Sequence, residues 1–161
     1  MERETNMMKW ALMGTALAAL TGCVAVEANE VAAKTTVSHF GSQAMGGTQL
    51  PFSKSVTAGD TIYISGELGT DPATGNLVTG GTGPETTQIF INMERTLASQ
   101  GADLSNIVKC TVYLNNIDNF GEMNTAYKAA LPDPKPARAT VAVTALAMGA
   151  NLEIDCIAVK L

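Results

Sequence analysis

The sequence predicts an α+β domain in which two helices pack on one face of a mixed β-sheet. Three observations support this prediction: segments with alternating apolar and polar residues, two segments with apolar residues at helical spacing, and breaks rich in Gly or Pro between them. The expected order is three strands, a helix, a strand, a helix and two strands, which is typical of α+β domains. At 161 residues the chain has room for one such domain and an extension.

The predicted domain begins with three strands. The first covers residues 35–40, and the next two, 53–57 and 61–67, are joined by the turn Ala58-Gly59-Asp60. The following segment, 69–83, is rich in Gly, Thr, Asp and Pro, so we expect a surface loop there.

The first helix is predicted over residues 85–100. Pro84 suits its opening turn, and Gly101 is a typical residue for its end. Apolar residues recur at positions i, i+4 and i+8, which predicts that this side is buried: Ile89, Met93 and Leu97.

A strand over 107–114 separates this helix from a second one, predicted over 117–131. The second helix has apolar residues at helical spacing: Phe120, Met123 and Tyr127. Three prolines between residues 132 and 136 prevent its continuation. Two closing strands are expected over 138–145 and 151–159.

One face of the predicted sheet has no helix to cover it. The side chains expected there are together too apolar to remain entirely in water: Tyr63, Ser65, Thr111, Tyr113, Ala142, Ile157 and Val159. The composition agrees, because 46% of the residues are hydrophobic and only 16% are charged. We therefore predict an oligomer that closes this face.

Charge and reactive residues exclude several classes of function. A net charge of −5 argues against a nucleic-acid partner, because binding to phosphates needs a basic patch. The single histidine, His39, leaves histidine-based triads and zinc sites without enough side chains. No glycine-rich loop for phosphates or dinucleotides follows a predicted strand.

Cys110 and Cys156 each lie on the core-facing side of a predicted strand. Two buried free thiols are the favoured interpretation. A disulfide stays open, because the sequence does not show whether the two residues come close enough.

The first 22 residues have the pattern of an export signal. Lys9 precedes an apolar run over 10–20, and the run ends in Leu20-Thr21-Gly22-Cys23, as in a bacterial lipoprotein signal with Cys23 as the lipidated residue. The run is shorter than the ~20 residues of a membrane span. Ordinary secretory cleavage after Ala28 is a second possibility.

We therefore expect a signal peptide over 1–22, a tether over 23–34 and a domain over 35–161. This organisation predicts a protein of the periplasm or cell envelope, held by a lipid on Cys23. Glu2 and Glu4 are unusual in the positively charged start of a signal, so initiation at Met7 or Met8 is also open.

The closing strands carry a cation and a carboxylate at informative positions. Alternation places Arg138 and Glu153 on the side away from the most apolar residues of their strands. If the strands are neighbours, both side chains leave one face, where they could hold a small acid and transfer protons. In a simple hairpin turning near Met148 they would be offset by roughly 16 Å, so a bulge or a second subunit would have to bring them together.

Several motifs resemble those of the RidA (YjgF/YER057c/UK114) family, with the spacing intact from about residue 51 to the C-terminus. They are Pro51-Phe52-Ser53, Ile62-Tyr63-Ile64-Ser65-Gly66, Thr111-Val112-Tyr113-Leu114, Met123-Asn124, Pro136-Ala137-Arg138 and Glu153-Ile154. The resemblance implies a chorismate-mutase-like fold and a homotrimer with active sites between subunits. It also implies hydrolysis of reactive enamines and imines, such as 2-aminoacrylate, to 2-oxo acids and ammonia without a metal or cofactor.

The resemblance implies roles for individual residues as well. Arg138 would bind the substrate carboxylate, and Glu153 would activate the water that adds to the imine carbon. The other residues implied in the substrate pocket are Phe52, Ser65, Gly66, Asn124 and Thr140.

Three residues depart from the family pattern. Phe52 stands where Tyr is usual, Glu67 where Gln is usual, and Ala139 where Ser is usual. The extra negative charge of Glu67 could weaken the binding of small anions. A non-catalytic member that binds ligands or acts as a holdase in the cell envelope is therefore the alternative to a deaminase.

Overall fold

A computed structural model describes residues 35–45 and 48–160 of the chain. These residues belong to one compact unit. The expected signal peptide, tether and lipidation site at Cys23 lie outside the described residues. Neither α-helix in the described part has the length and hydropathy needed to cross a membrane.

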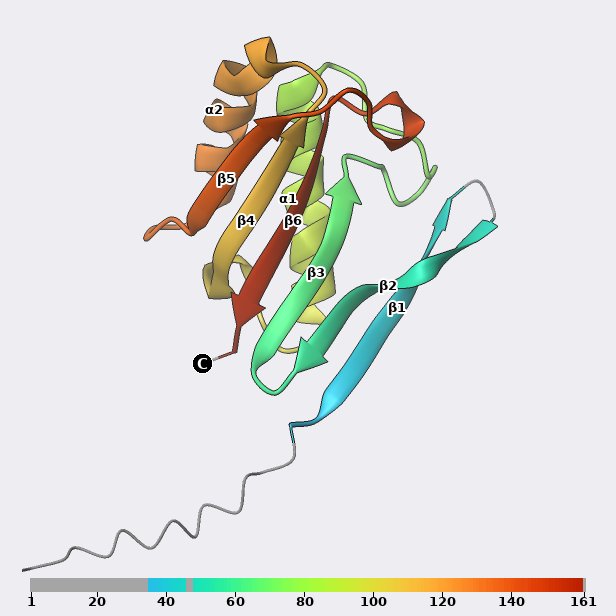
Figure 1. The fold of residues 1–161 in the computed structure, drawn as a ribbon, viewed down its shortest axis with the longest axis vertical. Helices are drawn as coiled ribbons and strands as arrows, with labels where there is room; N and C mark the ends of the chain where they lie inside the picture. Colours follow the sequence, from blue (N-terminus) through green and yellow to red (C-terminus); the bar gives the residue numbers. More distant parts are fainter. Residues whose placement is uncertain (1–34, 46–47, 161) are drawn as a thin grey trace, which may run out of the picture. The chain divides into compact units, whose positions relative to one another are not determined.

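In the described residues, six strands form one sheet in the order β1-β2-β3-β6-β4-β5 (Figure 1). The strands are β1 (Val37–Met45), β2 (Thr48–Ala58), β3 (Thr61–Leu68), β4 (Ile107–Leu114), β5 (Ala137–Ala142) and β6 (Leu152–Val159). All neighbouring pairs are antiparallel except β4 and β5, which are parallel. The first two strands are longer than predicted, because they continue their pairing across a β-bulge.

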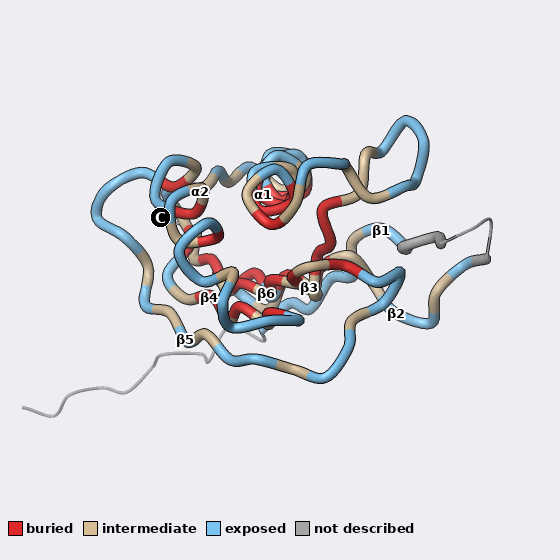
Figure 2. Tube along the Cα trace, turned by 90° about the horizontal axis from the view of Figure 1, so that it is seen from above, coloured by how far each residue is buried: buried red, intermediate tan, exposed pale blue. Residues whose placement is uncertain are grey.

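Two helices, α1 (Thr82–Ala98) and α2 (Phe120–Ala130), lie on the same face of the sheet (Figure 2). The core fills the space between them and the sheet, and its fully buried members include Ile62, Phe90, Val112, Leu114, Leu152 and Ile154. The prediction of an α+β domain with two helices on one face of a mixed sheet is therefore confirmed.

The predicted core positions of α1 are also confirmed: Ile89, Met93 and Leu97 are fully buried. The helix begins three residues earlier than expected, after Gly81, and Gly101 beyond its end has a φ of 74°, which favours glycine. In the second predicted helix, residues 117–119 form a separate 3₁₀ turn before α2. Phe120 is partly exposed there, whereas Met123 and Tyr127 are buried.

The two closing strands, β5 and β6, are not the neighbours that the sequence suggested, because β4 lies between them (Figure 1), so they form no hairpin. The helix α2 connects β4 to β5, and a strand that follows such a crossover pairs in parallel with the strand before it. The chain therefore adds β5 at the outer edge and then returns across β4, so that β6 pairs with β4 on its other side.

The favoured interpretation of two free thiols is also wrong. Cys110 of β4 and Cys156 of β6 are direct cross-strand partners and form a disulfide within the core. Their Cα atoms are 4.1 Å apart. Because the sequence left the order of the strands open, it could not reveal that these two residues face each other.

Candidate active site

Arg138 is held at the edge of the sheet by residues of α2. Its Nη2 donates a hydrogen bond to Asn124 Oδ1 at 2.9 Å. The guanidinium carbon lies 4.5 Å from the centre of the Tyr127 ring and 5.6 Å from that of Phe120. A guanidinium stacks favourably on the faces of aromatic rings, and this stacking fixes the orientation of its plane. The structure thus brings Arg138 and Asn124 together within one chain.

Two buried hydroxyls on this side of the sheet have no hydrogen-bond partner in the described part of the chain, Tyr127 Oη and Thr140 Oγ1. Thr140 belongs to the same strand face as Arg138, because its cross-strand partner is the core residue Val112. Burial raises the pKa of Tyr127, although the charge of Arg138 acts in the opposite direction. Unpaired buried hydroxyls are costly, so they indicate polar groups available to a ligand or water.

Glu153 lies on β6 in a partly buried position. Burial and, to a smaller extent, the neighbouring Asp155 raise the pKa of its carboxyl group. Both effects disfavour the charged form. A carboxyl group with a raised pKa is suited to take up and return a proton near neutral pH.

Gly66 makes room for the Glu153 carboxylate. A Cβ atom at position 66 would lie 1.8 Å from Glu153 Oε1 and 2.8 Å from its Cδ. Only a residue without a side chain leaves this space free. The preceding residue, Ser65, donates its hydroxyl to the carbonyl of Ser53 at 2.7 Å. Phe52 is next to Ser53 on β2, and 45% of its side chain is exposed.

Arg138 and Glu153 leave opposite faces of the sheet. Arg138 is the partner of Cys110, which pairs with Cys156 on the helix-covered face. Glu153 is the partner of Tyr113, which pairs with Val141 on the face without helices. The expected side of Glu153 is therefore confirmed, whereas the expected side of Arg138 and their common face are wrong. Side chains do alternate along β5, as predicted. Its more apolar side, however, faces away from the helices instead of toward the core.

The structure thus makes two clusters from the predicted site residues. Arg138, Asn124 and Thr140 belong to the helix side, and Glu153 lies with Gly66 on the other side. Sequence reasoning missed Tyr127, which its periodicity identified only as a core residue. The sequence does contain a signal for this role: Tyr127 follows Asn124 by three residues, which places both side chains on one surface of α2.

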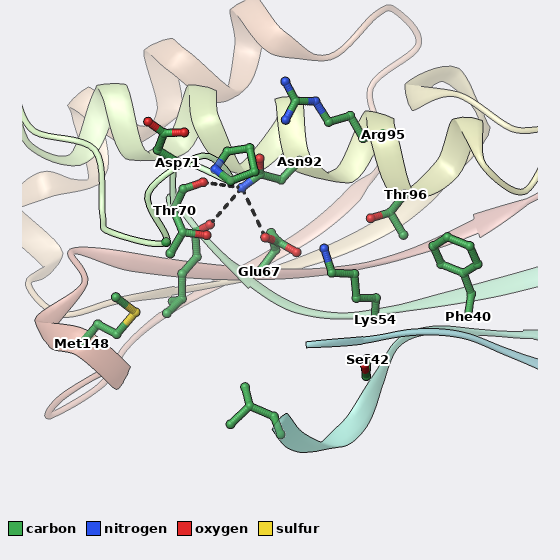
Figure 3. A pocket seen from close by; sticks show the side chains of 14 residues that line it. Phe40, Ser42, Lys54, Glu67, Thr70, Asp71, Asn92, Arg95, Thr96 and Met148 are labelled. Atoms are coloured by element: carbon green, nitrogen blue, oxygen red, sulfur yellow. Dashed lines mark hydrogen bonds between the residues drawn. The ribbon is translucent and has the colours of Figure 1, made fainter. Parts of the chain in front are cut away.

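A separate cavity of about 440 Å³ lies between the β1–β2 hairpin and α1 (Figure 3). Glu67, Lys54 and Asn92 contribute polar groups to its lining, and none of the predicted site residues lines it. Sequence reasoning noted Glu67 only as a departure from a family pattern. In residues 35–45 and 48–160, no group of three or more His, Cys, Asp or Glu residues could hold a metal ion.

Comparisons with known proteins agree with the motifs. The family model described as Endoribonuclease L-PSP matches residues 42–160. A protein from Bos taurus named 2-iminobutanoate/2-iminopropanoate deaminase is 44% identical over 110 residues, which are 68% of this chain and 80% of the relative. The Homo sapiens protein of the same name is 42% identical over 110 residues, with the same coverage of both chains.

Solved structures share the fold. The crystal structure of RidA from the Antarctic bacterium Psychrobacter sp. PAMC 21119 has a TM-score of 0.68 and 34% identity, covering 79% of this chain and 98% of that chain. Yeast Mmf1 has a TM-score of 0.71 and 30% identity, covering 78% of this chain and all of that one.

The expected periplasmic or envelope location is corrected by these relatives. Two relatives whose names state a compartment are a chloroplastic protein of Arabidopsis thaliana and a mitochondrial protein of Schizosaccharomyces pombe. The location inferred from residues 1–34 therefore does not agree with the compartments that these relatives' names state.

Proposed function

This chain belongs to the RidA (YjgF/YER057c/UK114) family, and on that premise we propose that it is an enamine/imine deaminase. Its substrates would be small 2-imino acids of the 2-aminoacrylate type, and its products a 2-oxo acid and ammonia. The observation that carries this proposal is the presence of a cation and a carboxylate with suitable surroundings. Arg138 is hydrogen-bonded to Asn124, and the Glu153 carboxylate occupies the space beside Gly66. The relatives with deaminase names support the same reaction class.

Arg138 would bind the substrate carboxylate. A guanidinium offers two parallel N–H groups to a carboxylate, and such charge-assisted pairs are stronger than neutral hydrogen bonds. Asn124 and the aromatic faces of Tyr127 and Phe120 support a fixed orientation of this group before the substrate arrives. Thr140 Oγ1, which has no partner in the described chain, would offer a further hydrogen bond.

Glu153 would perform the proton transfers. Its carboxylate takes a proton from water while the water oxygen bonds to the imine carbon, and the C=N π electrons move to nitrogen. The protonated Glu153 then gives its proton to the nitrogen of the tetrahedral intermediate. Glu153 next takes the remaining proton of the added hydroxyl and passes it to the same nitrogen, and the C–N bond breaks as the C=O bond forms, so ammonia leaves and a 2-oxo acid remains. General acid and base catalysis of this kind contributes about 10²–10⁴-fold.

We propose that the site is completed between two subunits of a homotrimer. The positions of Arg138 and Glu153 on opposite faces support this, because a substrate must touch both groups. Exposed apolar residues on the face of Glu153, Tyr63 and Val141, supply a surface that subunit contacts would cover. Phe52, Ser65 and Gly66 would line the pocket on the side of Glu153.

The test uses the purified full-length chain and an imino acid generated in the cuvette by an amino-acid oxidase. We expect faster loss of the imino acid with the protein than without it. Arg138→Ala and Glu153→Gln should each lower kcat/KM by about 10²-fold or more. Glu94→Gln and Lys128→Ala remove charges from exposed helix positions and should leave the rate unchanged.

A folded protein that does not accelerate this reaction would refute the deaminase. In that case a non-catalytic binding role would be the better hypothesis, and ligands of the Arg138 cluster would be sought next. A ribonuclease is disfavoured, despite the description of the family model, by the net charge of −5.

A further inference from the structure

We propose that the cavity between the β1–β2 hairpin and α1 is a second binding site, one that takes a free α-amino acid with an apolar side chain. This proposal is independent of the deaminase activity. Three features of the cavity support it: a buried carboxylate, a lysine that faces the cavity without pairing with this carboxylate, and apolar side chains in the lining (Figure 3).

Glu67 provides a fixed carboxylate inside the cavity. Its side chain is only 7% exposed, and its Oε1 accepts a hydrogen bond from Asn92 Nδ2 at 3.3 Å. Asn92 is itself held in place, because Nδ2 also donates to the carbonyl of Thr70 at 2.9 Å and Oδ1 accepts from Gln88 at 2.9 Å. Among the described residues, no hydrogen-bond donor reaches the second oxygen of Glu67.

Lys54 faces the same cavity from β2 but does not pair with Glu67. In residues 35–45 and 48–160, the ion pair between Lys135 and Asp133 is the only one. Lys54 is near enough to oppose the rise that burial causes in the pKa of Glu67. Two opposite charges that share a cavity without touching can both be satisfied by a molecule that carries both charges between them.

The charge balance of the lining points to a zwitterion. Arg95 adds a second cation from α1, and Asp71 adds a second carboxylate from the loop after β3. A simple cation would be repelled by Lys54 and Arg95, and a simple anion by Glu67 and Asp71. An α-amino acid would place its ammonium at Glu67 and its carboxylate at Lys54.

The remaining lining suits an apolar side chain. Phe40 and Met148 lie on either side of the charged groups (Figure 3), and Leu68 also lines the cavity. The volume of about 440 Å³ falls within the range of ~300–1,000 Å³ that is usual for small-molecule sites.

The test is titration calorimetry of the full-length chain with L-leucine, N-acetyl-L-leucine and L-leucinamide. We expect L-leucine to bind with a Kd of about 1 mM or lower. The acetylated compound lacks the ammonium and the amide lacks the carboxylate, so each should bind about tenfold more weakly or worse. No binding of L-leucine, or equal binding of L-leucinamide, would overturn the proposal.

Variants locate the ligand. Glu67→Gln keeps the shape of the side chain and its bond with Asn92, yet should weaken L-leucine binding about 10–100-fold, as should Lys54→Met. Glu94→Gln removes an exposed carboxylate from α1, the helix that carries Asn92 and Arg95, and should bind as the wild type does. Arg138→Ala should also bind normally. If Arg138→Ala loses binding while Glu67→Gln keeps it, the ligand occupies the proposed deaminase site and the second site does not exist.

Discussion

At residue 66, the absence of a side chain decides where the Glu153 carboxylate can lie. The nearest atoms to a Cβ there would be Glu153 Oε1 at 1.8 Å, Cδ at 2.8 Å and Cγ at 3.2 Å. All belong to one flexible side chain, so Gly66→Ala should move the carboxylate and leave the backbone in place. We expect kcat/KM to fall about tenfold or more, with a nearly unchanged melting temperature.

Gly121→Ala is the matched control for this change. A Cβ at that position meets no atom within 4 Å, and the residue lies in α2 with an ordinary helical backbone. The Gly121→Ala variant should be as active as the wild type, and its free energy of unfolding should be higher by about 0.5–1 kcal/mol. Full activity of Gly66→Ala would show that the position of the Glu153 carboxylate does not matter for the reaction.

The raised pKa of Glu153 gives the reaction a predicted pH dependence. Burial and Asp155 raise this pKa, so the carboxylate that acts as the base should be lost at a higher pH than an ordinary Glu would lose it. We expect the acid limb of kcat/KM to lie above the usual range of Glu, measured from pH 4 to 8. An acid limb in the usual Glu range or lower would contradict this assignment.

Stability should respond to pH at the same residue with a definite sign. A carboxyl group whose pKa is raised on folding contributes stability below its unfolded pKa and loses this contribution as pH rises through the folded pKa. Glu153→Gln should therefore not lower the melting temperature at pH 7, relative to the wild type, even though it should lower kcat/KM about 10²-fold or more. A clear loss of stability at pH 7 would mean that the ionised side chain stabilises the fold.

At the scale of elements, α2 controls the arginine of β5. Asn124 joins the two by its bond to Arg138 Nη2 at 2.9 Å. Asn124→Ala should release the guanidinium and raise KM for the imino acid about tenfold, with a smaller change in kcat. Lys128→Ala, an exposed change on the same helix, should leave KM unaltered. An unchanged KM in Asn124→Ala would leave the aromatic stacking as the only support of Arg138.

The elements also show what the sequence can predict and what it cannot. The strand over 107–114 and the buried side of α1 were predicted correctly, because they follow from local periodicity. The neighbours of β5 were not, because alternation assigns faces but not partners. The face of β5 that meets the core was predicted wrongly for a physical reason. Val141 is apolar yet 44% exposed, because it lies on the face that has no helix.

At the scale of the whole molecule, the apolar face of the sheet predicts an assembly. Tyr63 and Val141 are 50% and 44% exposed there, and a surface of this kind favours contact with another subunit. Val141→Lys should convert the proposed trimer to monomers, measured by light scattering after size exclusion. Ile91→Lys changes a residue with similar exposure, 39%, on the helix side and should leave the mass unchanged. A monomeric wild-type protein would refute the assembly itself.

The opposite faces of Arg138 and Glu153 make a sharper prediction about that assembly. If one subunit supplies Arg138 and its neighbour supplies Glu153, the inactive variants Arg138→Ala and Glu153→Gln should restore each other when their subunits are mixed. In randomly mixed rings, a site is intact only where a Glu153→Gln subunit gives its arginine to the glutamate of an Arg138→Ala subunit. This arrangement occurs at about a quarter of the sites.

The measurement is therefore the imine deaminase rate after the two variants are unfolded, mixed in equal amounts and refolded together. We expect about a quarter of the wild-type rate from the mixture and almost none from either variant refolded alone. Wild-type protein carried through the same steps controls for losses on refolding. If the mixture stays inactive although mixed trimers are detected by mass, both residues act within one subunit. One substrate would then have to contact Arg138 and Glu153 of the same subunit. The pairing of Arg138 with Cys110 and of Glu153 with Tyr113 argues against this, because it places the two side chains on opposite faces of the sheet.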